Sequence, residues 1–324
     1  MLRAYSTRSD LLVEVASPPA VATGIVWVDL LNPTADENAS VESLLGISIP
    51  SQDEMQEIEL SARLYQEDGA TFMTMTALAN LDGEAPVKTP VTFILKGATL
   101  ATVRWSDPRP FLAYQTRAAR QKEALSSTGE QVMLGILEAL TDRTADALEK
   151  LGNDIDAVSR EVFRNAGNKT RDLQSVIALI GQKAELLIMI QESLVSLGRV
   201  AAYHAALDPA PRKGGAGKES RSMLRIIQRD ALALGEHSKA LTGRVTFLLE
   251  ATLGMINLEQ NQIIKIVSVA AVVFLPPTLV ASIYGMNFGL MPELAWSWGY
   301  PMALGLMILS AVLPYLFFKR KGWL

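Results

Sequence analysis

The chain has 324 residues, 49% of them apolar, and its 30 basic and 34 acidic side chains give a formal charge of −4. It has no cysteine, so a disulfide scaffold, a cysteine-ligated metal centre and a cysteine nucleophile are excluded. Its two histidines, His204 and His237, are far apart in sequence and offer little for a Ser-His-Asp catalytic relay. The mildly acidic balance argues against a nucleic-acid partner, because phosphate binding needs clustered Lys and Arg.

The first third of the chain has a mixed α and β pattern. Residues 1–10 lack the apolar run and cleavage site of a secretory signal, so we expect this part in the cytoplasm. Thr34 with Glu37, and Ser51 with Glu54, form capping boxes that predict helix starts. Strands are predicted where β-branched and aromatic residues gather, at 25–31, 71–78, 91–96 and 99–105, with a tight turn at Gly97-Ala98. Residues 1–125 are therefore expected to form an α+β domain with a largely antiparallel sheet.

Long helices are predicted after Pro108 and Pro110. Apolar residues recur at steps of three and four from Leu137 to Val162 and again within 173–203, and the Pro- and Gly-rich segment 207–220 predicts a turn between antiparallel helices. The helix 130–161 carries many more carboxylates than basic residues. This acidic run is interpreted as a solvated face, with divalent cation binding as the alternative.

A single long helix is predicted beyond that turn. A heptad seam runs from Leu224 to Glu259 without a proline and continues into the apolar run 266–284. From 219 to 284 such a helix would be about 100 Å long at 1.5 Å per residue, which suits a stalk that ends in a membrane. Residues 126–265 are therefore assigned to a helical stalk.

The C-terminal part is almost free of charge. Between Ile266 and Phe318 the only charged residue is Glu293, and 266–284 and 299–318 each approach the length of a membrane span. Lys265 precedes the first span and the basic tail 319–324 follows the second. The positive-inside rule predicts two transmembrane helices with both termini cytoplasmic and the loop 285–298 outside, surrounded by membrane lipids.

The loop begins with a short motif. Tyr284-Gly-Met-Asn-Phe288 is followed by Met291-Pro-Glu-Leu294, and Gly285 is expected to end the first span in a left-handed cap. With two spans and a basic tail, this motif resembles the CorA family of divalent cation channels. The resemblance implies a funnel-shaped homopentamer in the cell inner membrane, with Gly285, Met286 and Asn287 as the selectivity filter. Neutral amide oxygens suit Mg²⁺, which gives up its water shell reluctantly.

One face of the first span has polar ends and an apolar middle, as a pore with a dewetting gate would, although the same face could simply pack helix against helix. By resemblance, Asn261 is the cytoplasmic entrance, Leu275 the gate and Thr278 a hydration-shell contact, while Pro276-Pro277 should free carbonyls in the span. The candidate pore-lining residues are Asn261, Ile264, Val267, Ser268, Ala271, Leu275, Thr278 and Ser282.

Two carboxylates outside this face complete the candidate sites. Glu293, repeated around a ring of outer loops, would attract cations, and the alternative is a solvated turn residue. Family resemblance implies regulatory carboxylates between protomers in the soluble domain, and Asp230 is our choice among them. His204 and His237 are interpreted as structural.

The sequence therefore predicts a magnesium channel that catalyses no reaction and needs no organic cofactor. It would also carry Co²⁺, with Ni²⁺ as a further candidate cargo, would be driven by the membrane potential, and would be closed by cytosolic Mg²⁺. The alternatives are a zinc transporter of the related branch and a membrane-anchored coiled-coil sensor that conducts nothing.

Overall fold

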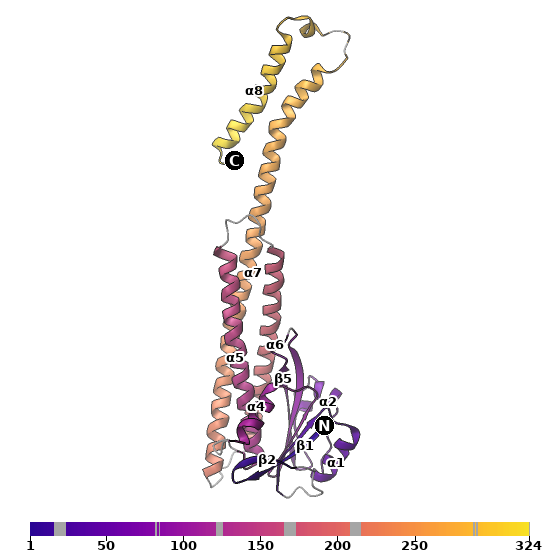
Figure 1. Ribbon diagram of the computed structural model, residues 1–324, viewed down its shortest axis with the longest axis vertical. Helices are drawn as coiled ribbons and strands as arrows, with labels where there is room; N and C mark the ends of the chain where they lie inside the picture. Colours follow the sequence, from indigo (N-terminus) through magenta and orange to yellow (C-terminus); the bar gives the residue numbers. More distant parts are fainter. Residues whose placement is uncertain are drawn as a thin grey trace. The chain divides into compact units, whose positions relative to one another are not determined.

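The computed structural model describes residues 1–15, 24–81, 83, 85–120, 126–164, 173–207, 215–287, 289 and 291–323 (Figure 1). The chain divides into two compact units, Met1–Leu248 and Leu249–Leu324, and helix α7 (Gly215–Tyr284) contributes to both.

The first unit contains a seven-stranded sheet in the order β2-β1-β3-β7-β6-β5-β4. Neighbouring strands are antiparallel except β3 and β7, which are parallel. The four predicted strands are confirmed, whereas β1, β2 and β4 were not predicted. The strands are β1 (Leu2–Arg8), β2 (Leu11–Val15), β3 (Ile25–Leu31), β4 (Leu64–Glu67), β5 (Ala70–Ala79), β6 (Val87–Lys96) and β7 (Thr99–Arg104).

Local turn and cap predictions are also confirmed. Gly97 adopts φ +60°, which a glycine tolerates without strain, and joins β6 to β7. Thr34 caps α1 (Ala35–Leu45) and Ser51 caps α2 (Gln52–Gln56), both through complete capping boxes. A short helix, α3 (Leu60–Arg63), then leads directly into β4.

Four further helices follow the sheet: α4 (Arg109–Ala118), α5 (Gly129–Arg164), α6 (Leu173–Leu207) and α7. The apolar stripe from Leu137 to Val162 is buried along α5, as its periodicity predicts. The predicted turn at 207–220 is too long, because α7 already begins at Gly215, and residues 208–214 lie outside the described part of the chain. Small residues without β-branching at 215–217 can enter the first helical turn, where backbone N–H groups need no helical partner.

Cores lie on both faces of the sheet. On one face, Trp27 and Phe93 pack with α4, α5, α6 and the beginning of α7, and on the other face Val28 and Ile94 pack with α1 and α2. A buried ion pair anchors the parallel strands: Arg104 on β7 donates from Nη2 to Asp29 on β3 at 2.7 Å and from Nε at 3.0 Å. The Thr102 hydroxyl donates to the same carboxylate at 2.7 Å, so Asp29 is fully hydrogen-bonded although it is 1% exposed.

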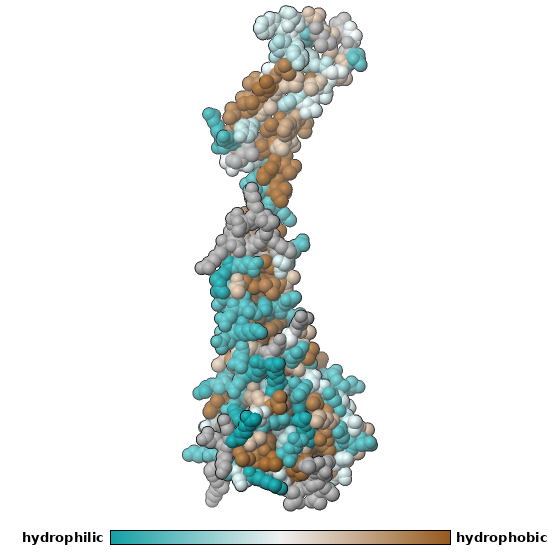
Figure 2. Space-filling model, in the orientation of Figure 1, coloured by the Kyte–Doolittle hydropathy of each residue, from teal (hydrophilic) through white to brown (hydrophobic). Residues whose placement is uncertain are grey.

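The second unit is built from the end of α7, a 3₁₀ turn η1 (Pro292–Ala295) and α8 (Gly299–Arg320). By length and composition, α6, α7 and α8 could each cross a membrane. The apolar side of α6 instead packs on the sheet, and its Ser196 hydroxyl accepts a hydrogen bond from the Thr76 backbone N–H at 2.9 Å. Hydrophobic side chains cover α8 and the end of α7, as Figure 2 shows. Within the described residues, the apolar surfaces of these two helices are mostly exposed, with 6% of each apolar window buried, against 28% for α6.

Candidate ion pathway

One face of α7 in the second unit is covered by α8. Val269 is 3% exposed, and Val273, Pro276, Pro277 and Val280 are half-buried at steps that keep them on the same side of the helix. The Lys265 ammonium lies 6.0 Å from the ring centre of Trp323, which follows α8, so the two helices run side by side as a hairpin. This contact fixes which face of α7 is left open.

The open face carries the predicted pore residues. Because successive residues of an α-helix are about 100° apart, this face lies roughly opposite the half-buried one. Ser268 is half-buried at the edge of the α8 contact, whereas its neighbour Val267 is exposed, so Val267 suits the open face better. The candidates that are exposed in the single chain are Asn261, Ile264, Val267, Ala271, Leu275, Thr278 and Ser282.

The polar group nearest the middle of this face is the Thr278 hydroxyl. Its Oγ1 donates to the Phe274 carbonyl oxygen at 2.7 Å, one turn earlier. With its proton committed to the backbone, the oxygen can only accept further hydrogen bonds. The waters around a hydrated cation donate outward, so an accepting oxygen at this position has the polarity that such a shell requires.

The two prolines do not break the helix. Helix α7 continues through Pro276 and Pro277 to Tyr284, and both rings are half-buried on the α8 side. Since proline has no N–H, the carbonyls of Val272 and Val273 lose their usual helical donors. Unpaired carbonyls inside an apolar segment are tolerated only where other polar groups or water can reach them.

The Gly-Met-Asn tripeptide follows the end of α7, but Gly285 does not form the left-handed cap that we expected. Its φ is not positive, and its N–H donates to the Ala281 carbonyl at 3.0 Å, so it continues the right-handed turn. The Met286 N–H then donates to the Ile283 carbonyl at 3.3 Å in a tighter, 3₁₀-type bond. Glycine permits the left-handed conformation without requiring it. Asn287 lies beyond this turn, exposed and outside the helix.

The loop closes tightly on the start of α8. The Gly299 N–H donates to the Trp296 carbonyl at 2.9 Å, and a Cβ at Gly299 would lie 2.2 Å from the Glu293 carbonyl oxygen. Gly299 is thus a structural requirement that sequence reasoning missed, because the clash depends on the loop path. The Glu293 carboxylate itself is exposed within η1.

Several acidic residues of α5 form ion pairs with basic side chains. Glu138 pairs with Arg117 at 2.7 Å, Asp154 with Lys183 at 2.5 Å, and Asp156 with Arg244. These contacts favour the interpretation of a solvated, ion-paired face. Within the described ranges, no three His, Cys, Asp or Glu side chains come together in a way that could hold a metal ion.

Asp230, on α7, has a different setting. Asp230 is half-buried, and its carboxylate accepts from Arg229 Nε at 3.2 Å. It also lies near Asp142 on α5, whose pKa is raised by burial and further by the charges of Glu138, Asp146 and Asp230 against the opposing effect of Arg117. The carboxylates around Asp142 therefore repel one another, which is the condition under which a cation is most stabilising.

The chain is similar to known proteins over nearly its full length. The profile of the family described as CorA-like Mg²⁺ transporter protein matches residues 22–320. A magnesium transport protein CorA of Pectobacterium atrosepticum is 38% identical over 307 residues, covering 93% of each chain, and one of Escherichia coli K12 is 37% identical over 333 aligned residues, covering 100% of each. The structure of a CorA magnesium transporter from Methanocaldococcus jannaschii is similar in fold, with a TM-score of 0.78 and 19% identity over 100% of this chain and 99% of that one.

Proposed function

This chain belongs to the CorA-like Mg²⁺ transporter family, its cargo is Mg²⁺, and we propose that the ion crosses the membrane through a central pore lined by α7 of five identical subunits. The observation that carries this proposal is the exposed face of α7. Its apolar middle would be unfavourable in water and its polar ends would be unfavourable in lipid. A ring of α7 helices around a narrow aqueous path satisfies both requirements, with α8 on the outside.

In this pore, Gly285, Met286 and Asn287 form the outer filter and Asn261 forms the cytoplasmic ring. Five neutral amide oxygens can accept hydrogen bonds from the shell of a hydrated ion without replacing its waters. Thr278, whose hydroxyl is oriented as an acceptor, would make the next shell contact. Leu275, Ala271 and Val267 make the apolar constriction, and Ile264 and Ser282 complete the lining.

Recognition through the hydration shell also bears on the range of cargo. Co²⁺ and Ni²⁺ form octahedral hydrated ions with the same charge, so we include them as further substrates. A zinc transporter of the related branch remains the main alternative, and the intact Gly-Met-Asn motif and the magnesium transport relatives argue against it. A coiled-coil sensor without conduction would leave Asn287 and the open face of α7 without a role.

The proposed site is the cell inner membrane, with both termini in the cytoplasm. Lys265, Lys319, Arg320 and Lys321 flank the hairpin at one end, as the positive-inside rule requires of the cytoplasmic side. Inward movement of a divalent ion then gains about 4.6 kcal/mol per 100 mV, twice the value for one charge, so uptake needs no nucleotide hydrolysis. Glu293 on the outer loop would raise the local cation concentration.

Regulation is proposed to act through the carboxylates of the soluble unit. When cytosolic Mg²⁺ is abundant, an ion bound at Asp230 would relieve the repulsion around Asp142 and link neighbouring subunits. Because Asp230 and the pore face are on the same helix, its bound state can bias the gate at Leu275.

The decisive experiment measures Mg²⁺ uptake into liposomes with an inside-negative potential. Wild type should take up Mg²⁺, Asn287→Ala should lose at least about tenfold of the rate, since 1.4 kcal/mol at the barrier is tenfold, and Ser297→Ala, a polar truncation elsewhere in the same loop, should retain it. A wild-type protein without flux, or an Asn287→Ala variant that matches Ser297→Ala, would overturn the proposed filter.

A further inference from the structure

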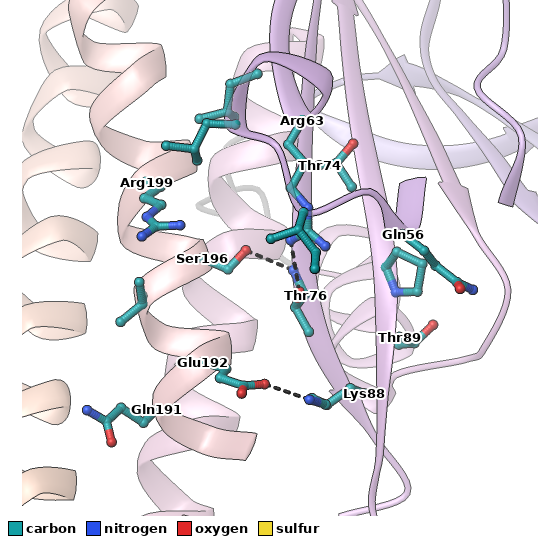
Figure 3. Close-up of a pocket in the computed structure, with 15 residues that line it drawn as sticks. Gln56, Arg63, Thr74, Thr76, Lys88, Thr89, Gln191, Glu192, Ser196 and Arg199 are labelled. Atoms are coloured by element: carbon teal, nitrogen blue, oxygen red, sulfur yellow. Dashed lines mark hydrogen bonds and ion pairs between the residues drawn. The ribbon is translucent and has the colours of Figure 1, made fainter. Parts of the chain in front are cut away.

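The first unit contains a cavity that the transport pathway does not use. It has a volume of about 850 Å³ and lies between α6 and the strands β4, β5 and β6 (Figure 3). Its wall combines Arg63 at the end of α3 and Thr74 and Thr89 on β5 and β6 with Ser196 and Arg199 on α6, which lie more than 100 residues further along the chain. A volume of this size is typical of small-molecule sites.

The charge of the wall is strongly positive. Arg63, Lys88 and Arg199 line it together with a single carboxylate, Glu192, which gives a net charge of +2. That carboxylate is already used, because Lys88 Nζ pairs with Glu192 Oε2 at 2.7 Å (Figure 3). In the described part of the chain, neither Arg63 nor Arg199 has a carboxylate partner.

Arg63 is held in place by neutral groups. Its Nε donates to the Glu57 carbonyl at 2.6 Å and its Nη1 donates to the Thr76 hydroxyl at 3.2 Å. These bonds fix the guanidinium but leave its charge unbalanced, and several of its five N–H donors stay free. Burial lowers the pKa of Arg63, and the positive charge of Arg199 lowers it further. Two cations therefore face the same cavity and repel each other, and a bound anion would offset this repulsion.

Uncharged polar groups complete the wall. The Thr89 side chain is buried, and its hydroxyl has no hydrogen-bond partner among the residues that the structure describes. The Ser196 hydroxyl accepts from the Thr76 N–H at 2.9 Å, so its own proton is available to a ligand. Hydroxyl donors beside two guanidinium groups match an anion with several oxygens better than one with a single acceptor.

We propose that this cavity binds a phosphate-bearing anion, with Arg63 and Arg199 holding the phosphate and the Ser196 and Thr89 hydroxyls completing its hydrogen bonds. A dianionic phosphate would neutralise the net charge of the wall. The cavity is larger than inorganic phosphate needs, and the exposed side chains of Ile58, Leu60 and Val195 line it with apolar surface. That surface can accept the base of a nucleotide, so both free phosphate and a nucleoside phosphate are sources of the required group.

Binding at this place would bridge the sheet and α6. The two elements already share the Thr76–Ser196 hydrogen bond and the Lys88–Glu192 ion pair at the cavity, and a ligand held by Arg63 and Arg199 would add a third link. A ligand that binds only the folded state raises its stability in proportion to the logarithm of ligand concentration over Kd. Occupancy should therefore be visible as a rise in the melting temperature.

The test uses the full chain in detergent with EDTA present, so that metal binding plays no part and the outcome is separate from that of the transport experiment. Potassium phosphate and ADP are each titrated by calorimetry and by thermal melting, with potassium chloride at equal ionic strength as the reference. The variants are Arg199→Gln, Arg63→Gln and, as the matched control, Arg225→Gln, which removes an exposed arginine of α7 outside the cavity.

Wild type and Arg225→Gln should bind at least one of the two probes and melt at a higher temperature with it than in chloride. Arg199→Gln should weaken that binding at least tenfold without lowering the melting temperature of the free protein, because Arg199 is exposed and has no hydrogen bond or ion pair among the described residues. Binding of both probes identifies the phosphate group as the determinant, and binding of ADP alone shows that the apolar surface is also required. Absence of binding to either probe, or equal affinity in wild type, Arg199→Gln and Arg63→Gln, would overturn the proposal.

Discussion

Replacing Leu275 by serine is the sharpest test of the proposed gate. In the single chain the Leu275 side chain is 68% exposed on the open face of α7, so the surface that would keep a constriction dry is free for contact with its counterparts in other subunits. Leu275→Ser removes that apolar surface and introduces a hydroxyl that water can solvate. We expect the closed channel to become wet and to leak Mg²⁺.

The size of the effect follows from the exposed fraction. Full burial of a leucine stabilises by about 1.5–3 kcal/mol, so about 1–2 kcal/mol per subunit is available at this position, or about 5–10 kcal/mol for the proposed ring of five subunits. If only about 1–2 kcal/mol of that total holds the gate closed, the ratio of conducting to closed channels rises about 5–30-fold. The leak should therefore be large compared with the error of a flux assay.

The assay loads proteoliposomes with a Mg²⁺-sensitive dye and measures uptake when the soluble unit is exposed to saturating Mg²⁺, the condition proposed above to close the wild-type channel. The control is Phe274→Ser, which removes an equally exposed apolar side chain, 70% against 68%, about 100° around the same helix. A leak that appears in Leu275→Ser and not in Phe274→Ser supports the gate. An unchanged closed-state flux in Leu275→Ser, or the same leak in both variants, would refute the reasoning from the exposed face.

Three further predictions concern the soluble unit. Asp29→Ala should lower the free energy of unfolding by about 3–5 kcal/mol, because it removes the buried carboxylate that pairs with Arg104 and leaves that guanidinium only its exposed partner, Asp107. Truncation of Asp107 should cost less than about 1 kcal/mol. Urea titration of both variants checks this, and equal losses would contradict it. Asp142→Asn should raise the melting temperature at pH 7, because the folded-state pKa of Asp142 lies above its ordinary value of 3.8 and ionisation of this carboxyl therefore lowers the stability of the wild type. The advantage of the variant should vanish as the pH falls through the raised pKa towards 3.8. An advantage that grows on acidification would contradict this prediction. Asp230→Ala should weaken the protection of α7 from protease by Mg²⁺, and protection equal to wild type would remove Asp230 from the regulatory site.

The sequence predicts those elements whose pattern is local. Strands β3, β5, β6 and β7 are rich in β-branched and aromatic residues and are largely buried, so their composition identifies them. Strands β1, β2 and β4 lie at or near the sheet edges, where polar side chains such as Gln66 and Glu67 face water and dilute the signal. The parallel pairing of β3 with β7 joins segments about 70 residues apart, which no local pattern encodes.

The same distinction applies to the sites. The open face of α7 could be predicted because helical periodicity alone places Asn261, Leu275 and Thr278 on one side. The cavity of Arg63 and Arg199 could not, because it depends on α6 docking against β5 through contacts between residues more than 100 positions apart. The backbone conformation of Gly285 could not be predicted either, because glycine allows both a left-handed and a right-handed turn, and the hydrogen bonds around it select the right-handed one.

The hairpin of α7 and α8 also bears on how the protein reaches its membrane. In the proposed orientation, the segment that must cross the bilayer is the short loop 285–298, and Glu293 is its only charge. Outward movement of that negative charge is favoured by an inside-negative potential, by about 2.3 kcal/mol per 100 mV for a full crossing. At the other end, the Lys265 ammonium lies over the Trp323 ring, and the basic tail adds three more charges that resist translocation. The two helices are thus suited to enter the bilayer together as one folded hairpin, with the loop leading and the cationic ends held back.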